Sequence, residues 1–166
     1  LYRRGWRGMN LDISKSSIDL FNLARPHDIN INCAVSDFNG VTNYYENSPI
    51  NQQNSLLFQN EKQKKIKIQS YKLSEILKLR NISKVDYINI DTEGNELKVL
   101  FGLDFNIIDP FLLTIEDNSF NINNENKKEK INYLEKNKYK LINIIGVTMF
   151  FVKKDSVAEI SELIKI

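Results

Sequence analysis

Short apolar runs alternate with amphipathic stretches along most of the 166-residue chain. The runs have the length and the β-branched and aromatic content of strands, whereas the stretches between them place apolar residues at helical spacing. Alternating strands and helices favour an α/β fold with a mostly parallel sheet. The predicted strands cover residues 8–13, 31–35, 41–46, 65–71, 85–90 and 111–116, and the predicted helices cover 14–25, 73–80, 93–103, 129–137 and 156–166.

Turn and capping residues mark several of these boundaries. Ser14 is expected to cap the first helix, and Pro26 to end it. Residues 139–154 are predicted to form two strands that turn at Gly146, which gives an antiparallel hairpin at one edge of the sheet. The polar stretches 47–65 and 119–128 are predicted loops, the first of them long enough to cover a binding site. The length predicts a single domain over residues 1–166.

Parallel α/β sheets bind their ligands at the carboxyl ends of the strands. This rule selects four places in the sequence, each directly after a predicted strand. They are Asp12, the corner Cys33–Ser36, the segment Asp91–Gly94, and the triplet Glu116–Asn118. The side chains at these places are the candidates for a functional site.

Asp12 has two interpretations. A carboxylate at the end of a strand can accept hydrogen bonds from both hydroxyl groups of a ribose, because its two oxygens take both donors. Aspartate is also common at helix N-termini, where it caps backbone N–H groups without any ligand. The position of Asp12 before the predicted helix fits both interpretations equally.

Asp91 and Glu93 follow an apolar strand and precede Gly94, whose lack of a side chain lets the backbone turn sharply or approach a ligand. Two neighbouring carboxylates raise each other's proton affinity, which suits a group that accepts a substrate proton or holds a cation. The alternative is capping of the following helix by Asp91 or Thr92. Two acids and a glycine after a buried strand favour the functional interpretation.

The remaining candidates are weaker. Glu116 and Asn118 could bind a substrate hydroxyl, or could simply form a turn. Cys33 is expected to be a packed small residue rather than a catalytic thiol, because the single histidine, His27, is not next to it in the sequence. With one histidine and one cysteine, a structural zinc site is not expected.

Composition narrows the class of protein. The net charge of +2 gives no case for a nucleic-acid partner. A single cysteine excludes an internal disulfide and fits a reducing compartment, so a cytoplasmic location is expected. No apolar run is long enough to span a membrane. Composition therefore gives no case for a nucleic acid or a membrane span, and it does not name a partner.

Three segments together resemble the FkbM-type S-adenosylmethionine-dependent methyltransferases. They are "GWRGMNLD", "NCAVSD" and "IDTEGNE", in this order and followed by "LLTIEDN", so that the resemblance runs through nearly the whole chain. It implies the Rossmann-like class I methyltransferase fold and transfer of a methyl group to oxygen, often on a sugar or a natural product. S-adenosyl-L-methionine is the implied cofactor, and a small molecule or a glycan is the implied acceptor.

The resemblance also implies roles for single residues. Asp12 would bind the ribose of the cofactor and Ile13 would lie beside the adenine, with Cys33 and Ala34 on the adenine side. Asp91 would face the methionine end of the cofactor and the acceptor, with Glu93 close by, and these two acids are the candidate bases. The loop 47–64 would cover the acceptor.

The first strand of this family and its glycine-rich loop would precede Leu1, so the sequence is expected to be an N-terminally truncated domain with an open edge inside its sheet. This leaves a second hypothesis, a non-catalytic Rossmann-like remnant that acts structurally or through a partner. A third is a nicotinamide-dependent oxidoreductase, which Asp12 alone would allow. The paired acids after residues 85–90 speak against the third hypothesis, since hydride transfer has no evident use for them.

Overall fold

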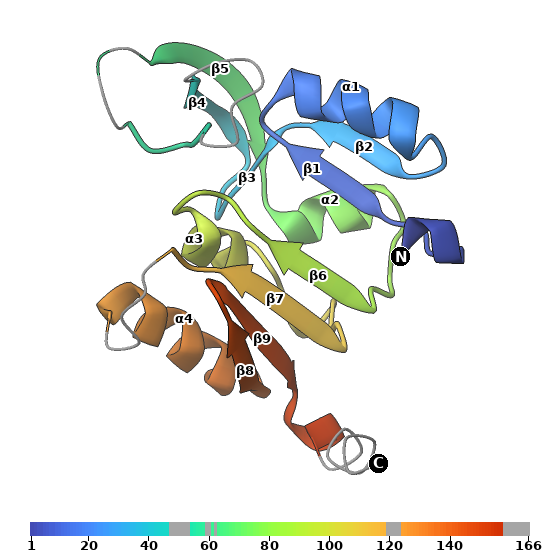
Figure 1. Cartoon of the computed structure of the whole chain (residues 1–166), viewed down its shortest axis with the longest axis vertical. Helices are drawn as coiled ribbons and strands as arrows, with labels where there is room; N and C mark the ends of the chain where they lie inside the picture. Colours follow the sequence, from blue (N-terminus) through green and yellow to red (C-terminus); the bar gives the residue numbers. More distant parts are fainter. Residues whose placement is uncertain (47–53, 59–60, 62, 119–123, 158–166) are drawn as a thin grey trace.

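The computed structural model describes residues 1–46, 54–58, 61, 63–118 and 124–157. The predicted C-terminal helix 156–166 and parts of both predicted polar loops lie largely outside these ranges. In the described residues, strands and helices alternate along the chain as the hydrophobic pattern predicts (Figure 1). No helix in these ranges is long and apolar enough to cross a membrane.

The first βαβ unit forms a small parallel sheet. Strand β1 (Met9–Asp12) leads into helix α1 (Lys15–Ala24), and strand β2 (Ile29–Asn32) returns parallel to β1. The hydroxyl of Ser14 accepts a hydrogen bond from the backbone N–H of Ser17 at 3.3 Å, which confirms the predicted cap. In Figure 1, α1 lies along β1 and β2.

The single strand predicted over residues 31–35 is wrong. Its first part belongs to β2, and its last part is a separate two-residue strand, β3 (Ala34–Val35). Cys33 lies between them and donates its N–H to Asp12 O at 3.1 Å, after which the chain leaves β1. β3 instead pairs with β5 (Lys64–Tyr71), which pairs on its other side with β4 (Gly40–Glu46). A short, mostly apolar run cannot show that its two halves pair with different strands.

A four-stranded sheet carries the second half of the chain. Its order is β6 (Tyr87–Ile90), β7 (Leu112–Glu116), β9 (Thr148–Lys153) and β8 (Tyr139–Ile145). The hairpin that turns at Gly146 is confirmed, with β8 at the edge. Three strand pairs are parallel and three are antiparallel among the described residues, so the sheets are mixed rather than mostly parallel.

Two helix boundaries differ from the prediction. Helix α2 (Leu73–Leu79) agrees with it, but α3 (Glu96–Phe101) begins later, because a tight turn occupies the residues after β6. Helix α4 (Glu125–Lys136) begins earlier, because the side chain of Asn124 accepts hydrogen bonds from the N–H groups of Asn126 and Lys127. Short 3₁₀ helices, η1 (Tyr2–Arg4) and η2 (Lys154–Ser156), complete the described elements.

Helix α2 joins the two halves of the molecule. Its Leu73 and Leu77 form a buried cluster with Leu103 and Ile108, against which side chains of β1 and β6 pack. The larger core lies under β7 and β9 and includes Leu113, Ile115, Met149 and Phe151. In Figure 1, the strands β1, β6 and β7 point the same way, so that their carboxyl ends meet on one side.

Within the described residues, β1 is hydrogen-bonded to β2 alone among the strands, and β6 to β7 alone. Each therefore has an edge without a strand partner, and every residue of β1 is only half-buried. The first strand of the family, which the resemblance implies between β1 and β6, stays a prediction.

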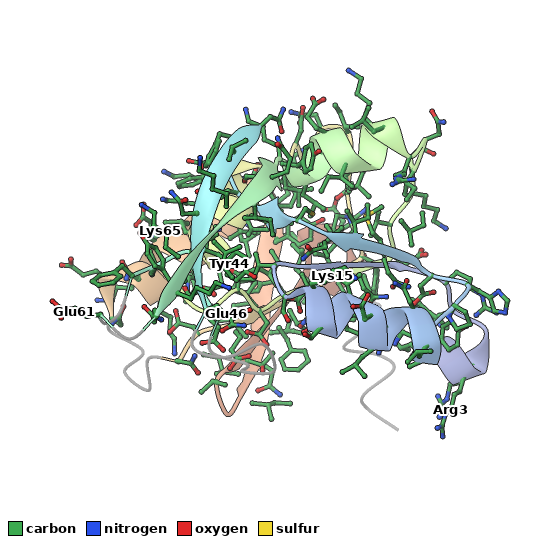
Figure 2. All side chains as sticks on the ribbon, turned by 90° about the horizontal axis from the view of Figure 1, so that it is seen from above. Arg3, Lys15, Tyr44, Glu46, Glu61 and Lys65 are labelled. Carbon is green, nitrogen blue, oxygen red and sulfur yellow. The ribbon has the colours of Figure 1, made fainter. Side chains whose placement is uncertain are left out.

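The β4–β5 hairpin extends away from the N-terminal end of the molecule. Viewed from above, Glu61 and Lys65 lie at one side and Arg3 of η1 lies at the other (Figure 2). Tyr44 and Glu46 share one face of β4, and the Tyr44 hydroxyl lies 3.5 Å from Glu46 Oε1. Tyr44 is buried in a small cluster with Ala34 and Ile68.

Candidate active site

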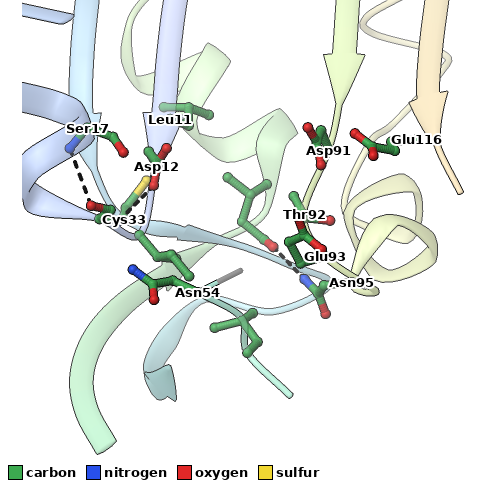
Figure 3. A pocket seen from close by; sticks show the side chains of 14 residues that line it. Leu11, Asp12, Ser17, Cys33, Asn54, Asp91, Thr92, Glu93, Asn95 and Glu116 are labelled. Atoms are coloured by element: carbon green, nitrogen blue, oxygen red, sulfur yellow. Dashed lines mark hydrogen bonds between the residues drawn. The ribbon is translucent and has the colours of Figure 1, made fainter. Parts of the chain in front are cut away.

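A cavity of about 410 Å³ opens where β1, β3, β6 and β7 end. This volume lies within the range of small-molecule sites. Side chains from both halves of the chain surround it, as Figure 3 shows. The lining consists of Leu11, Asp12, Ile13, Ser14, Ser17, Cys33, Val35, Asn54, Leu56, Asp91, Thr92, Glu93, Asn95 and Glu116.

Asp12 lines the cavity and is also bonded to the start of α1, whose N-cap residue is Ser14. Its Oδ1 accepts the backbone N–H of Ser14 at 2.7 Å, and its carboxylate is hydrogen-bonded to the side chain of Ser17. Burial raises the pKa of Asp12, and the negative charge of Asp91 adds to this, although the two hydrogen bonds act in the opposite direction. A carboxylate has about four acceptor positions, so two remain for a ligand. The N-cap of α1 is Ser14 and not Asp12, so the capping interpretation of Asp12 is wrong, while ribose binding by Asp12 stays a prediction.

The turn after β6 presents its acids to the cavity instead of capping α3. The N-cap residue of α3 is Asn95, which makes no capping bond through its side chain. The Asn95 side chain instead donates to Val35 O at 2.8 Å and so fixes the turn to the end of β3. The cavity is instead lined by Asp91, Thr92 and Glu93. Because the N-cap of α3 is Asn95, the alternative in which Asp91 or Thr92 caps this helix is wrong.

Asp91 and Glu116 form a carboxyl pair across two strands. Ile90 is in register with Ile115, so the residues that follow them end β6 and β7 side by side. Figure 3 shows the two carboxyl groups facing each other. A hydrogen bond with Asp91, together with burial and the charges of Asp91, Glu93 and Glu96, raises the pKa of Glu116 to about 7. At neutral pH the pair therefore retains a proton for part of the time.

The charged side chains that are described in the cavity lining are all acidic. Among the described residues, the lining contains four carboxyl groups, those of Asp12, Asp91, Glu93 and Glu116, and no lysine, arginine or histidine. Burial and the charges of Asp91 and Glu96 also raise the pKa of Glu93. The cavity should therefore attract a cationic ligand and repel an anionic one. No group of three or more histidine, cysteine, aspartate or glutamate residues in the described ranges is arranged to hold a metal ion.

Cys33 is buried in the lining and is not activated. Burial raises the pKa of its thiol to about 11, and the charge of Asp12 contributes to the same direction. The thiolate is the reactive form of cysteine, so this side chain is inert at neutral pH. Its small, weakly polar side chain forms part of the cavity wall.

The cavity brings together six of the eight residues that the sequence proposed for binding or catalysis. Asp12, Ile13, Cys33, Asp91, Glu93 and Glu116 all line it. Ala34 does not, because it is fully buried and packs towards Tyr44 and Ile68. Asn118 is exposed and also lies outside the lining. The individual roles of these residues stay predictions.

Sequence reasoning missed several lining residues. Ser17 lies one turn into α1, where the pattern gave no sign of it. Asn54 and Leu56 belong to the predicted covering loop, but its polar composition did not single them out. Ser55, between them, donates its hydroxyl to Glu93 O at 2.9 Å, which fixes this segment against the acid turn.

A scan against protein-family models matches residues 1–141 to the methyltransferase FkbM domain. The matched region includes β1, β3, β6 and β7 and every residue that lines the cavity. Neither a search of curated proteins nor a search of solved structures gives a match. Because the family model covers most of the sequence, the resemblance noted from the motifs is confirmed, and the chain belongs to the FkbM methyltransferase family.

Proposed function

We propose that this domain transfers a methyl group from S-adenosyl-L-methionine to a hydroxyl group of a neutral sugar, glycan or natural product. The observation that carries the proposal is the charge of the cavity, whose lining, in the part of the chain that the structure describes, has four carboxyl groups and no basic side chain. S-adenosylmethionine has a sulfonium and an ammonium group and matches such a lining. The dinucleotide NAD carries two phosphates, so the same lining disfavours a nicotinamide-dependent oxidoreductase.

The lining also suits the uncharged parts of the cofactor. Asp12 retains acceptor positions for two ribose hydroxyls, as the Rossmann-like fold of this family implies. Leu11, Ile13 and Val35 offer an apolar wall for a flat base. When bound, S-adenosylmethionine supplies an electrophilic methyl group to the site.

The chain itself would orient the acceptor and remove its proton. Asp91 and Glu93 are the candidate bases, and either can accept the hydroxyl proton because both line the cavity. Glu116, next to Asp91, would hold the acceptor, while the role of Asn118 in acceptor binding rests on sequence position alone. Asn54 and Leu56 close one side of the cavity and help to exclude water.

Calorimetry on the full-length protein tests the cofactor. S-adenosylhomocysteine should bind and NAD should not, and Asp12→Ala should weaken binding by tenfold or more, for the loss of a charge-assisted contact worth about 1.5–3 kcal/mol. Asp19→Ala is the matched control, because Asp19 is an exposed acid on α1 that pairs with Lys15. Binding of NAD in preference to S-adenosylhomocysteine would refute the assignment.

Radiolabelled methyl transfer to a panel of neutral, amino and phosphorylated glycans tests the reaction. Neutral acceptors should be methylated and phosphorylated ones rejected. Asp91→Asn or Glu93→Gln should lower kcat by about 10²–10⁴ if that residue is the base. Transfer that survives both substitutions, singly and together, would show that neither acid is the base.

One observation favours the second candidate, a non-catalytic domain. β1 and β6 each have an edge without a strand partner in the described residues. If full-length protein binds neither S-adenosylhomocysteine nor S-adenosylmethionine, the non-catalytic role replaces the proposed one.

A further inference from the structure

The turn that carries Asp91 and Glu93 has an unusual backbone. Glu93 has a φ of 53° and Gly94 a φ of 101°, so two consecutive residues lie in the left-handed region. Residues other than glycine adopt this region at a free-energy cost, and they persist there only when their surroundings hold them. Something outside the turn must therefore stabilise it.

The carboxylate of Glu96, in the first turn of α3, provides this support. Its Oε1 accepts hydrogen bonds from Gly94 N at 2.8 Å, from Thr92 N at 3.2 Å and from Thr92 Oγ1 at 3.2 Å. Consecutive N–H groups in a left-handed turn form a concave anion site, and here a side chain of the protein itself occupies it. Glu96 thus fixes the path of the backbone from Asp91 to Asn95.

Lys130 of α4 links this support to the neighbouring strand. Its Nζ donates to Glu96 Oε2 at 3.1 Å and to Asp117 Oδ2 at 2.9 Å. Lys127, one turn earlier on α4, lies 3.8 Å from Asp117 Oδ1. All four side chains are almost fully buried. A buried ion cluster is weak evidence for stability, because apolar residues of similar volume stabilise a fold as well or better.

The position of the cluster suggests what it does. Asp117 directly follows Glu116 at the end of β7, and Glu96 holds the turn that follows β6. Lys130 therefore connects the two chain segments that carry the Asp91–Glu116 pair. We propose that Lys130 is a positioning residue that clamps these two segments and so keeps the carboxyl groups of Asp91 and Glu116 in contact. This inference rests on the proposed function for its catalytic meaning, but the clamp itself can be measured without catalysis.

Without the clamp, the pair should separate. The groups that face Glu116 are Asp91 and Glu93 from the turn after β6 and Glu96 from α3, and all of them are acids. Repulsion among these carboxylates would then move the ends of β6 and β7 apart. The hydrogen bond with Asp91 is the largest cause of the raised pKa of Glu116, so this pKa reports directly on whether the two groups stay together.

The test is a carboxyl ¹³C NMR titration of the full-length protein without any methyl donor, with the Glu116 signal assigned through Glu116→Gln. In the wild type, the pKa of Glu116 should be about 7. In Lys130→Met it should fall towards the ordinary glutamate value of 4.5. Lys130→Arg, which keeps the charge and its hydrogen bonds, should restore part of the raised value. Lys128→Met is the matched control, because Lys128 is an exposed residue of the same helix, and this variant should titrate like the wild type.

Two outcomes would overturn the clamp. An unchanged pKa of Glu116 in folded Lys130→Met would show that α4 does not position the pair, and a raised pKa would show that Lys130 acts only through its charge. Should Lys130→Met fail to fold, Lys130→Gln decides instead, because it keeps a polar side chain but removes the charged link. Loss of the positive charge alone would raise the pKa of Glu116, so a fall would still report that the pair has separated. A fall in the pKa without any methyl transfer by the wild type would support the clamp and refute the proposed function, so the two failures are distinguishable.

Discussion

Gly102, at the C-terminal end of α3, lies close to Ser36, which follows β3. A β-carbon added at Gly102 would lie closer than 3.0 Å to Ser36 O, and also 3.2 Å from Ser36 C and 3.3 Å from Val99 O. Ser36 is fully buried, and its N–H is bonded to Tyr71 O at 3.0 Å, so it cannot easily move away. Gly102→Ala should therefore force α3 away from β3.

Two effects of opposite sign determine how much Gly102→Ala changes the free energy of unfolding. Gly102 has a φ of −80° and a ψ of −2°, which alanine adopts readily, so reduced entropy of the unfolded chain should stabilise the variant by about 0.4–1 kcal/mol. Ordinary contacts begin near 3.4 Å, so the backbone of Ser36 must yield by more than 0.4 Å. Such overpacking costs about 1–3 kcal/mol, and it should exceed the entropic gain. The expected net destabilisation is roughly 1–2 kcal/mol, which lowers the Tm by about 2–8 °C for a domain of this size.

Thermal and urea unfolding of the two alanine variants Gly102→Ala and Gly8→Ala measure this difference. Gly8 is the matched control, because nothing lies within 4 Å of the position that its added β-carbon would take, and its φ is outside the left-handed range. Gly8→Ala should leave the free energy of unfolding unchanged or raise it by up to about 1 kcal/mol. If Gly102→Ala proves as stable as Gly8→Ala, the reasoning from the Ser36 contact is wrong.

Three further predictions concern other parts of the fold. Ser14→Ala removes the cap of α1 and should lower the free energy of unfolding by about 1 kcal/mol, measured by urea unfolding. Tyr139→Phe removes a buried hydroxyl whose single O–H can donate to Pro110 O at 2.6 Å or to Asp109 Oδ1 at 3.0 Å. The buried carbonyl of Pro110 would lose this partner, which should cost about 1–3 kcal/mol in the same assay. The folded protein raises the pKa of Glu116 from 4.5 to about 7 and so binds a proton that the unfolded chain releases. Stability should therefore fall as the pH rises through this window, and Glu116→Gln should abolish that part of the pH dependence.

The sequence predicted most of the strands and helices because each of them has a local signal. Period-two alternation marked β5, and turn residues bounded the β8–β9 hairpin at Gly146. Ser14 could be predicted as the N-cap of α1, because serine favours this position and the residues after it have the apolar spacing of a helix. The edge of the sheet where the cavity lies was also predictable, since it depends only on the order of strands and helices.

Pairing between distant strands had no such signal. The break at Cys33 depends on β3 finding β5, which begins about thirty residues later in the chain, and the apolar run does not encode that partner. The mixed character of the sheets has partly the same origin, because β4 looks like any other strand in sequence but runs antiparallel to β5. Lys127 and Lys130 gave no sign of being buried, since lysines on a polar helix usually face solvent.

The acidic stretch after β6 shows how the lack of a signal for distant pairing affects the prediction of a functional site. Asp91 and Glu93 are close in sequence and were interpreted as one pair. The register of β6 and β7, however, gives Asp91 a second partner, Glu116, which comes from another strand. That pairing depends on a strand register, a strained turn and a lysine on a distant helix, none of which a local pattern can encode. The residue types of the site could therefore be predicted from the sequence, whereas the contacts that would set their proton affinities come only from the fold.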